Sequence, residues 1–334
     1  MQRIVSGLMA LLAFGLASNA AASPWTLPAG DVALKFSTDL QFADREFLQE
    51  GDNVPFSIDG EFWAGHFRSD LRYGITDRIE VGGQLSFDYL SYNADEVFFG
   101  EGVINTEFTP GSQQSIAANI VSVDRTAAGL GDIRLFLRNR LTPLGRAVVA
   151  TEVNLKIPSG YEQPVGTFTE DDPARGVGDD VTLGDGQMDV TGMLLMGFAP
   201  TWDMFVRVDV GGRYRLFGPA PQVVTAFKTG YRVSDSFLPY VQLDATISIG
   251  EGDSIGQTFE SLDPDLPANA YTLATLNPRN QTLDRSFISP GFGMIFTTGT
   301  RDIDISYSTM AWGKNIPQLH IVSVGTNLRF AARN

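Results

Sequence analysis

Arginine and acidic side chains supply most of the chemistry that this 334-residue sequence offers, because histidine and cysteine are nearly absent. The sequence has two histidines, His66 and His320, and no cysteine. A histidine-based metal site or general base, a thiolate metal site, a catalytic cysteine and a disulfide framework therefore lack their residues. We predict that the chain is not an enzyme and holds neither a metal ion nor a cofactor.

Charged residues recur at every second position in several stretches. In 203–216, Arg207, Asp209, Arg213 and Arg215 alternate with mostly apolar residues. Arginine pairs bidentately with carboxylates, so such a face either braces a wall through ion pairs or forms a polar constriction that sets the charge preference of a passing solute. The residues that we predict to line a lumen and to influence its selectivity are Arg68, Asp70, Arg72, Asp132, Arg134, Arg138, Asp189, Arg207, Asp209, Arg213 and Asp244.

Strict alternation of apolar and polar residues predicts the elements that carry these side chains. In 31–42, Val32, Leu34, Phe36 and Leu40 alternate with polar residues, which is typical of a strand with one apolar face. The same pattern predicts twelve strands, over 31–42, 61–75, 78–90, 129–141, 146–157, 185–198, 203–216, 223–233, 237–249, 286–297, 301–311 and 319–330. Most of them exceed the ~9–11 residues that a tilted strand needs to cross a bilayer.

The connections between these strands have different lengths at the two ends. Tight turns follow the even-numbered strands, whereas four connections after odd-numbered strands are long, over 43–60, 91–128, 158–184 and 250–285. Outer-membrane barrels have short periplasmic turns and long extracellular loops. We therefore predict an all-β fold, an antiparallel transmembrane β-barrel of twelve strands. A soluble β-sandwich is the alternative, but it would not favour charged residues along one strand face or short turns at only one end.

Aromatic residues near the ends of the predicted strands support the barrel, because aromatic side chains concentrate at both membrane interfaces. Near the periplasmic rim we place Tyr73, Phe198, Trp202, Tyr231, Phe237, Tyr240, Phe296 and Phe330. Near the opposite rim we place Phe42, Phe87, Tyr89, Tyr214, Phe217 and Trp312.

The first residues have the pattern of a cleaved secretory signal. Arg3 precedes an apolar run over 4–17, and small residues over 18–22 fit a cleavage site before Ser23. The apolar run is shorter than the ~20 residues of a spanning helix. We therefore divide the chain into a signal peptide, 1–22, and an outer-membrane β-barrel domain, 23–334, and predict the outer membrane of a Gram-negative cell as its location.

Charge and the last strand indicate the partners. A formal net charge of −15 argues against nucleic acid. The strand over 319–330 ends in the aromatic Phe330 and resembles the signal that the barrel-assembly machinery reads, although four residues follow that aromatic. We expect this machinery, outer-membrane lipids and a small organic solute as partners.

An outer-membrane hydrolase is a less favoured alternative. The phospholipase type needs a lipid-facing histidine with a serine two residues later, but Arg68 follows His66 and Val322 follows His320 at that spacing. The acidic runs 170–172 and 179–180 lack the spacing of a calcium-binding loop. We expect these runs to be solvated loop charge.

Four segments resemble one family in their order and rough spacing. They are YGITDRIEVGG (73–83), GLGDIRLFLRNRL (129–141), EVNLKIPSG (152–160) and LGDGQMD (183–189). Together they resemble the outer-membrane transporter-like family of the meta-pathway of phenol degradation. The resemblance implies a β-barrel channel for small organic, including aromatic, compounds, and it carries over no functional residues.

From these observations we predict a channel that passes small organic solutes, aromatic or hydrophobic, passively through a narrow charged lumen. The first predicted strand begins about eight residues after the cleavage site, which leaves no room for an N-terminal hatch. We therefore expect an extracellular loop as the gate, over 91–128 or 158–184. A closed barrel that serves as a membrane anchor and displays its surface loops is the alternative.

Overall fold

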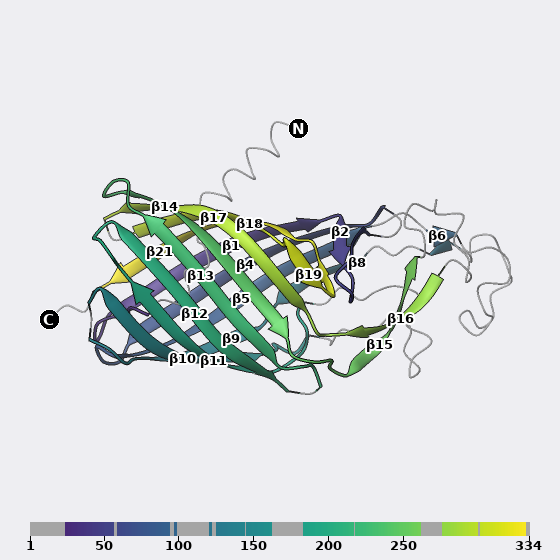
Figure 1. The fold of residues 1–334 in the computed structure, drawn as a ribbon, viewed down its shortest axis with the longest axis horizontal. Helices are drawn as coiled ribbons and strands as arrows, with labels where there is room; N and C mark the ends of the chain where they lie inside the picture. The colour runs from purple at the N-terminus through teal and green to yellow at the C-terminus, as the bar shows by residue number, and fades with distance from the viewer. Residues whose placement is uncertain are drawn as a thin grey trace.

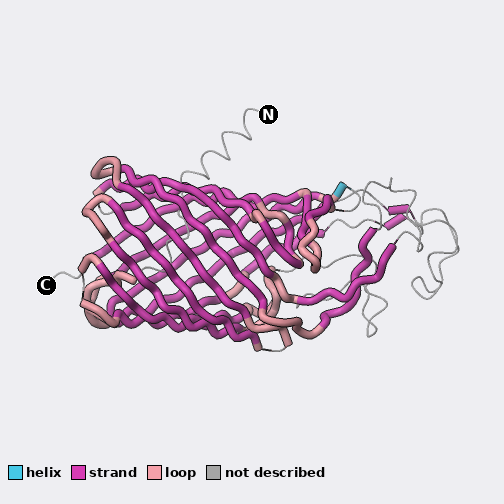
Figure 2. Tube along the Cα trace, in the orientation of Figure 1, coloured by secondary structure: helices cyan, strands magenta, loops and turns pink. Residues whose placement is uncertain are grey.

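A computed structural model shows the chain as an antiparallel β-barrel with long loops at one end (Figures 1 and 2). The structure describes residues 24–56, 59–93, 97–98, 120–121, 125–143, 145–161, 183–216, 218–261, 276–299 and 301–331. The predicted signal peptide, 1–22, lies outside them. Within the described part of the chain, no helix is long and apolar enough to cross a membrane.

Twelve strands form the wall. They are β1 (Val32–Ala43), β4 (Glu61–Gly74), β5 (Ile79–Asn93), β8 with β9 (Arg125–Leu130 and Ile133–Arg140), β10 (Ala147–Ile157), β11 (Asp189–Phe198), β12 (Met204–Arg215), β13 (Gln222–Tyr231), β14 (Phe237–Ser248), β17 (Ser286–Thr298), β18 with β19 (Arg301–Thr309 and Trp312–Lys314) and β21 (His320–Phe330). The sheet contains fourteen strands, because two of the twelve wall strands are interrupted. β8 and β9 pair with the same side of β5 and together form one wall strand. β18 and β19 pair with the same side of β17 and form another.

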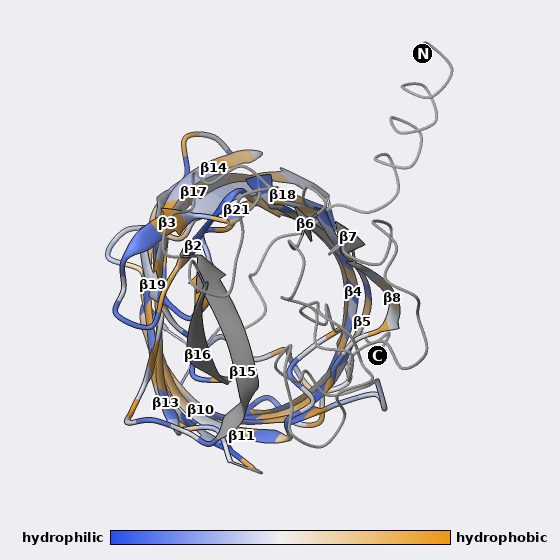
Figure 3. Cartoon of the chain, turned by 90° about the vertical axis from the view of Figure 1, so that its right-hand side faces the viewer, coloured by the Kyte–Doolittle hydropathy of each residue, from blue (hydrophilic) through white to orange (hydrophobic). Residues whose placement is uncertain are grey.

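The wall closes because the first and last strands pair along their whole length. Val32 lies opposite Phe330 and Phe42 opposite His320 in the β1–β21 register, and β14 pairs with β17 across the intervening loop. Closure gives each of the twelve wall strands a neighbour on both sides. Figure 3, which looks along the barrel, shows the resulting ring.

The twelve predicted strands correspond to these twelve wall strands, and most boundaries agree within one or two residues. The two main differences have local causes. The strand predicted over 129–141 is interrupted between Leu130 and Ile133, where a Cβ on Gly131 would lie 1.8 Å from Asp88 Oδ2. The strand predicted over 185–198 begins only at Asp189, because Asp185 belongs to a loop that turns toward the interior.

The long loops contain short strands that alternation does not predict. These are β2 (Arg45–Phe47), β3 (Asn53–Pro55), β6 (Val97–Phe98), β7 (Ile120–Val121), β15 (Ser254–Ser261), β16 (Leu276–Thr282) and β20 (Ile316–Pro317). The β15–β16 hairpin extends beyond the barrel at the long-loop end (Figure 1). The opposite end, which carries only tight turns, is called the short-turn end below.

Burial is inverted relative to a soluble protein. On β1 the inward residues Lys35, Ser37 and Asp39 are buried, whereas the outward Phe42 is exposed. Exposed leucines, valines and phenylalanines recur on the outward positions of nearly every wall strand. An apolar exterior around a polar interior is what a barrel in lipid requires, and it is opposite to the core of a β-sandwich.

The aromatic residues follow the predicted rims with one exception. Tyr73, Phe198 and Trp202 at the short-turn end are exposed, as are Phe42 and Tyr214 at the long-loop end. Tyr240 was expected on the outer face, and this was wrong. Its side chain is buried in the barrel, where its hydroxyl donates to Asp304 Oδ1 at 2.6 Å. Phe217 lies outside the described residues.

Candidate functional site

A cavity of about 620 Å³ occupies the long-loop half of the barrel interior. Charged side chains from the wall, among them Arg68, Asp132, Arg134 and Arg213, line part of it. Apolar residues line the rest, namely Phe62, Leu90, Leu183, Leu283, Phe287, Met310, Ile316, Leu319 and Ile321. The volume lies within the ~300–1,000 Å³ that is usual for pockets that take small molecules.

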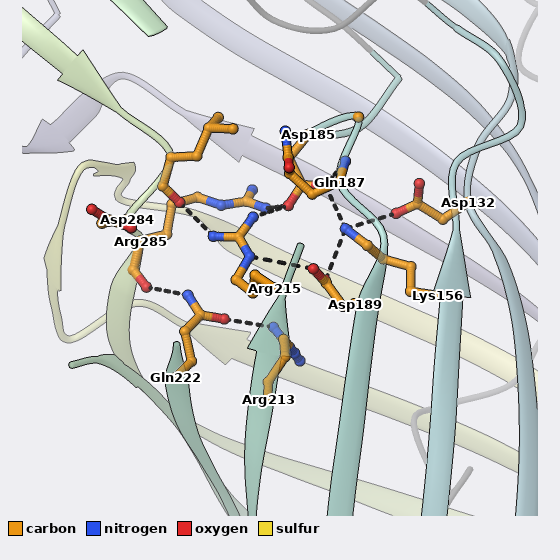
Figure 4. Close-up of polar contacts among 12 residues, drawn as sticks. Asp132, Lys156, Asp185, Gln187, Asp189, Arg213, Arg215, Gln222, Asp284 and Arg285 are labelled. Carbon is orange, nitrogen blue, oxygen red and sulfur yellow. Dashed lines mark hydrogen bonds and ion pairs between the residues drawn. The ribbon is translucent and has the colours of Figure 1, made fainter. Parts of the chain in front are cut away.

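An ion-paired network joins one wall of this cavity to two loops (Figure 4). Lys156 on β10 contacts Asp132 at 3.6 Å and Asp189 at 3.0 Å, and it also bonds Asp185. Arg215 on β12 donates to Asp185 at 2.5 Å and to Asp189 at 3.4 Å. The network therefore contains both charges at close range, and every acid in it has a basic partner.

Asp185 is the centre of this network. Burial alone would raise the pKa of this loop carboxyl, but the neighbouring Arg285, Lys156 and Arg215 hold its pKa well below its usual range. Asp185 thus stays ionised at neutral pH and fixes the loop that precedes β11. Burial and the hydrogen bond to Asp132, at 2.5 Å, raise the pKa of Tyr161 on the adjoining loop.

The loop that follows the β15–β16 hairpin is also fixed to the wall. Arg215 donates to the Leu283 carbonyl at 2.7 Å, and Gln222 donates to the Arg285 carbonyl at 3.0 Å. Asp284 accepts from the backbone N–H groups of Ala220, at 2.8 Å, and Gly252. These bonds hold the segments before and after the β15–β16 hairpin at the mouth of the barrel.

The short-turn half of the interior is packed with ion pairs. Arg138 is 1% exposed and lies between Glu80 and Glu152, to which its guanidinium donates at 2.9 and 2.6 Å. Arg72 donates two further bonds to Glu80, at 2.8 and 2.9 Å. Because each charge here is paired, this cluster braces β4, β5, β9 and β10 against one another.

The segment before β1 lies inside this half of the barrel. The Leu27 N–H donates to Glu80 Oε2 at 2.9 Å, and Arg140 donates to the Thr26 hydroxyl at 3.2 Å. A Cβ on the inward-facing Gly197 would lie 2.5 Å from Pro24 and 2.4 Å from Trp25. The expectation that no N-terminal hatch fits was therefore wrong, because a few residues suffice when a glycine and a buried carboxylate on the wall receive them.

Elsewhere in the interior, several buried polar atoms on the wall strands have fewer bonds. Lys228 Nζ lies 3.5 Å from the ring centre of Tyr240 and 3.7 Å from Asp304 Oδ2. Lys228 Nζ and single carboxylate oxygens of Asp39, Asp70, Asp209 and Asp304 are buried without a hydrogen-bond partner. Buried polar atoms of this kind need ordered water or a passing polar group to satisfy them.

The eleven predicted lumen residues all lie on inward-facing positions, in three groups. The cavity is lined by Arg68, Asp132, Arg134 and Arg213, with Asp189 beside it in the network. The short-turn half contains Arg72, Arg138, Arg207 and Asp209, with Arg207 bonded to Asp209. The remaining two are Asp70, which accepts from Gln84 at 2.8 Å, and the half-buried Asp244.

Sequence reasoning missed several residues of the interior. Lys35 and Lys156 share the inward parity of their strands, so alternation could have found them. Asp185, Arg285 and Tyr161 belong to loops, where no periodicity exists to indicate which way a side chain points.

Neither histidine is hydrogen-bonded to a serine hydroxyl, the nucleophile of such a hydrolase, among the described residues. His66 faces inward and bonds Asp88 at 2.9 Å. His320 faces outward, and its Nδ1 lies 2.7 Å from the Tyr307 hydroxyl. The described part of the chain contains no group of three His, Asp or Glu side chains arranged to hold a metal ion.

No family model and no curated protein matches the sequence, so the predicted family stays a prediction. Solved structures do match. An outer-membrane channel from Pseudomonas putida F1 superposes with a TM-score of 0.60 at 12% identity, over 94% of this chain and 100% of that one. More remote matches are the monoaromatic hydrocarbon channel CymD, with a TM-score of 0.44 at 12% identity over 92% and 90% of the two chains, and the KdgM porin, with 0.45 at 6% over 90% and 99%. The chain therefore has the fold of an outer-membrane β-barrel channel.

Proposed function

We propose that this chain is an outer-membrane channel that passes small organic solutes passively through a narrow, charged lumen. The observation that carries the proposal is the 620 Å³ cavity inside the barrel, which is lined by both charged and apolar side chains. A barrel of eight strands is filled by its own side chains, whereas this wider barrel leaves a cavity that a solute can occupy.

The orientation follows from the loops. The short-turn end faces the periplasm and the long-loop end faces outward, as in other barrels of this class. A solute enters the cavity from outside and reaches Lys228 Nζ and Asp304 Oδ2, which lack a hydrogen-bond partner and replace part of its hydration. The strand β21 carries the signal for the barrel-assembly machinery, and lipid covers the apolar exterior.

Two segments control the passage. The N-terminal residues 24–27 fill part of the periplasmic half of the lumen. For a solute to exit, this segment must move or the solute must pass beside it. An extracellular loop, over 91–128 or 158–184, acts as the outer gate. Most of both loops lies outside the described residues, so the outer gate rests on their length and position in the sequence.

The test is solute flux in liposomes that contain the purified full-length barrel. We expect slow swelling with small organic solutes, and faster swelling when residues 24–27 are deleted from the mature chain. Liposomes with an unrelated closed barrel supply the control. If neither the intact barrel nor the deletion variant passes any solute, the channel proposal fails.

A closed anchor barrel is the second candidate, and the tightly paired cluster around Arg138 favours it. An anchor would show no flux in either form, and cells that lack the protein would grow equally well on every candidate solute. The two candidates are therefore separated by the same measurement.

A further inference from the structure

Two arginines in the cavity, Arg134 and Arg213, have no carboxylate partner among the residues that the structure describes. We propose that they form a binding site for a small organic anion, an apolar molecule that carries one carboxylate. This site rests on the proposed channel function for its physiological role. It names the class of solute that the cavity recognises.

The strand register leaves both arginines without an acidic neighbour. Arg134 lies between Gln84 on β5 and Lys156 on β10. Arg213 lies between Thr191 on β11 and Gln222 on β13. In the same barrel Arg138 lies between Glu80 and Glu152 in the register and bonds both. The neighbouring strands thus place carboxylates beside Arg138, which stabilises the wall, and place none beside Arg134 or Arg213.

The other arginines of the cavity lining each have a carboxylate partner. Three acids of the network, Asp132, Asp185 and Asp189, face three bases, Lys156, Arg215 and Arg285. The remaining acid of the lining, Asp88, bonds His66, and Arg68 bonds Asp39. Arg134 and Arg213 are therefore the two arginines of the described cavity lining that form no ion pair, within a protein whose formal net charge is −15.

The two guanidinium groups face the same space. Both residues line the cavity, and they come close enough for their charges to repel one another, as Arg68 also repels Arg134. Asp132, Asp189 and Asp70 attract Arg134 without forming an ion pair with it, and Asp189 attracts Arg213 in the same way. Asp132 and Asp189 pair with Lys156, and Asp70 accepts a hydrogen bond from Gln84. The only bond of the Arg213 guanidinium within the described residues goes to the Gln222 amide oxygen, at 2.9 Å. An anion placed between the two arginines relieves their repulsion and satisfies their free donors.

The apolar residues that line the cavity favour a ligand whose remaining part is apolar. Phe287, Leu283, Met310 and Ile321 line the same cavity as the two arginines. A fully hydrated inorganic anion gains nothing from these side chains, whereas an aromatic or aliphatic carboxylate buries its apolar part against them. The site therefore favours an organic anion over both an inorganic anion and a neutral analogue of the same shape.

The test is isothermal titration calorimetry of the purified full-length barrel with benzoate, benzyl alcohol and inorganic phosphate. We expect benzoate to bind more tightly than either of the others. Arg134→Gln and Arg213→Gln are each expected to weaken benzoate binding about tenfold, because each removes a charge-assisted hydrogen-bond donor. The double variant is expected to weaken it further, and Arg134→Lys to retain part of the affinity because it keeps the charge.

Arg78→Gln is the matched control, since it removes the same charge from an exposed turn at the other end of the barrel. It is expected to leave benzoate binding unchanged, and benzyl alcohol binding is expected to be equal in all variants. Circular dichroism and heat-modified gel mobility check that each variant is folded. Benzoate affinity that is equal in the wild type and a folded double variant would overturn the proposal, as would phosphate or benzyl alcohol binding as tight as benzoate.

The outcome is separable from that of the channel proposal. Arginine-dependent benzoate binding without flux in liposomes would retain the site and reject the channel. Flux of organic solutes that is indifferent to the two arginines would retain the channel and reject the site.

Discussion

The guanidinium of Arg138 donates to Glu80 Oε1 at 2.9 Å in a pair whose side chains are 1% and 0% exposed. Two strands, β5 and β9, are joined by this contact, and Glu152 on β10 joins the same guanidinium from the other side. The pair also supports the N-terminal segment, because the second oxygen of Glu80 accepts the Leu27 N–H. One ionic cluster thus braces the wall and holds the segment that narrows the lumen.

Arg138→Gln is expected to destabilise the barrel by ~3–5 kcal/mol, because it leaves two buried carboxylates without their shared partner. The measurement is urea-induced unfolding in detergent micelles. Arg78→Gln, at an exposed turn, is expected to change stability by less than ~0.5 kcal/mol. Equal stability of the two variants would show that the cluster does not brace the wall.

Val208→Arg places a charge on the outward face in the middle of β12, where Val208 is exposed to the surroundings of the barrel. In a bilayer this substitution is expected to cost ~2–4 kcal/mol, and Ser236→Arg, in a turn at the rim, about 0–1 kcal/mol. Folding into lipid vesicles at a series of urea concentrations measures both. If the two variants are equally stable in lipid, the assignment of this face to lipid is wrong.

Gly197→Leu is expected to expel the N-terminal segment from the lumen, since even a Cβ at this position would overlap Pro24 and Trp25. The sequence contains no cysteine, so Thr26→Cys introduces a single thiol that reports access to this segment. We expect a water-soluble maleimide to label this thiol at least tenfold faster in the Gly197→Leu background. Gly192→Leu is the control, because a Cβ there meets no atom within 4 Å. Labelling that is equally fast in both backgrounds would place the segment outside the lumen.

The stabilising effect of Asp185 is expected to depend on pH in one direction. Its pKa in the folded barrel is held below its usual value by the neighbouring arginines and Lys156. The stabilisation is therefore complete at pH 7 and is lost as the pH falls below about 4, through the ordinary range of a carboxyl and toward its lowered folded value.

Asp185→Asn tests this. At pH 7 the variant is expected to be less stable than the wild type by ~3 kcal/mol, and the difference is expected to shrink between pH 5 and pH 3. Asp235→Asn, in an exposed turn, supplies the control. A difference that is the same at pH 7 and pH 3 would contradict the ionic role of Asp185.

The alternation in β1 and β12 was enough to predict strands, their inward and outward faces and most of their ends, because side-chain direction in a strand has a period of two whatever the partner strand is. Lumen positions such as Arg134, Arg138 and Arg213 followed from the same parity. Tyr240 was misplaced because it was assigned to the outer belt from its aromatic ring and its position near a strand end, although it shares the parity of the inward Asp244. Parity, and not the aromatic ring, decides between the belt and the space beside Lys228.

The sequence by itself determined a closed barrel with a charged interior, because alternation and turn length are local properties of the chain. Only the tertiary structure decided which charges are paired. Arg138 and Arg213 have the same chemistry and the same parity, yet the first lies between two glutamates and the second between a threonine and a glutamine. Register and loop placement set these neighbours, and both depend on contacts between residues far apart in the chain. The role of Gly197 also depends on a distant residue, because the lack of a side chain there matters only where Trp25 lies against it.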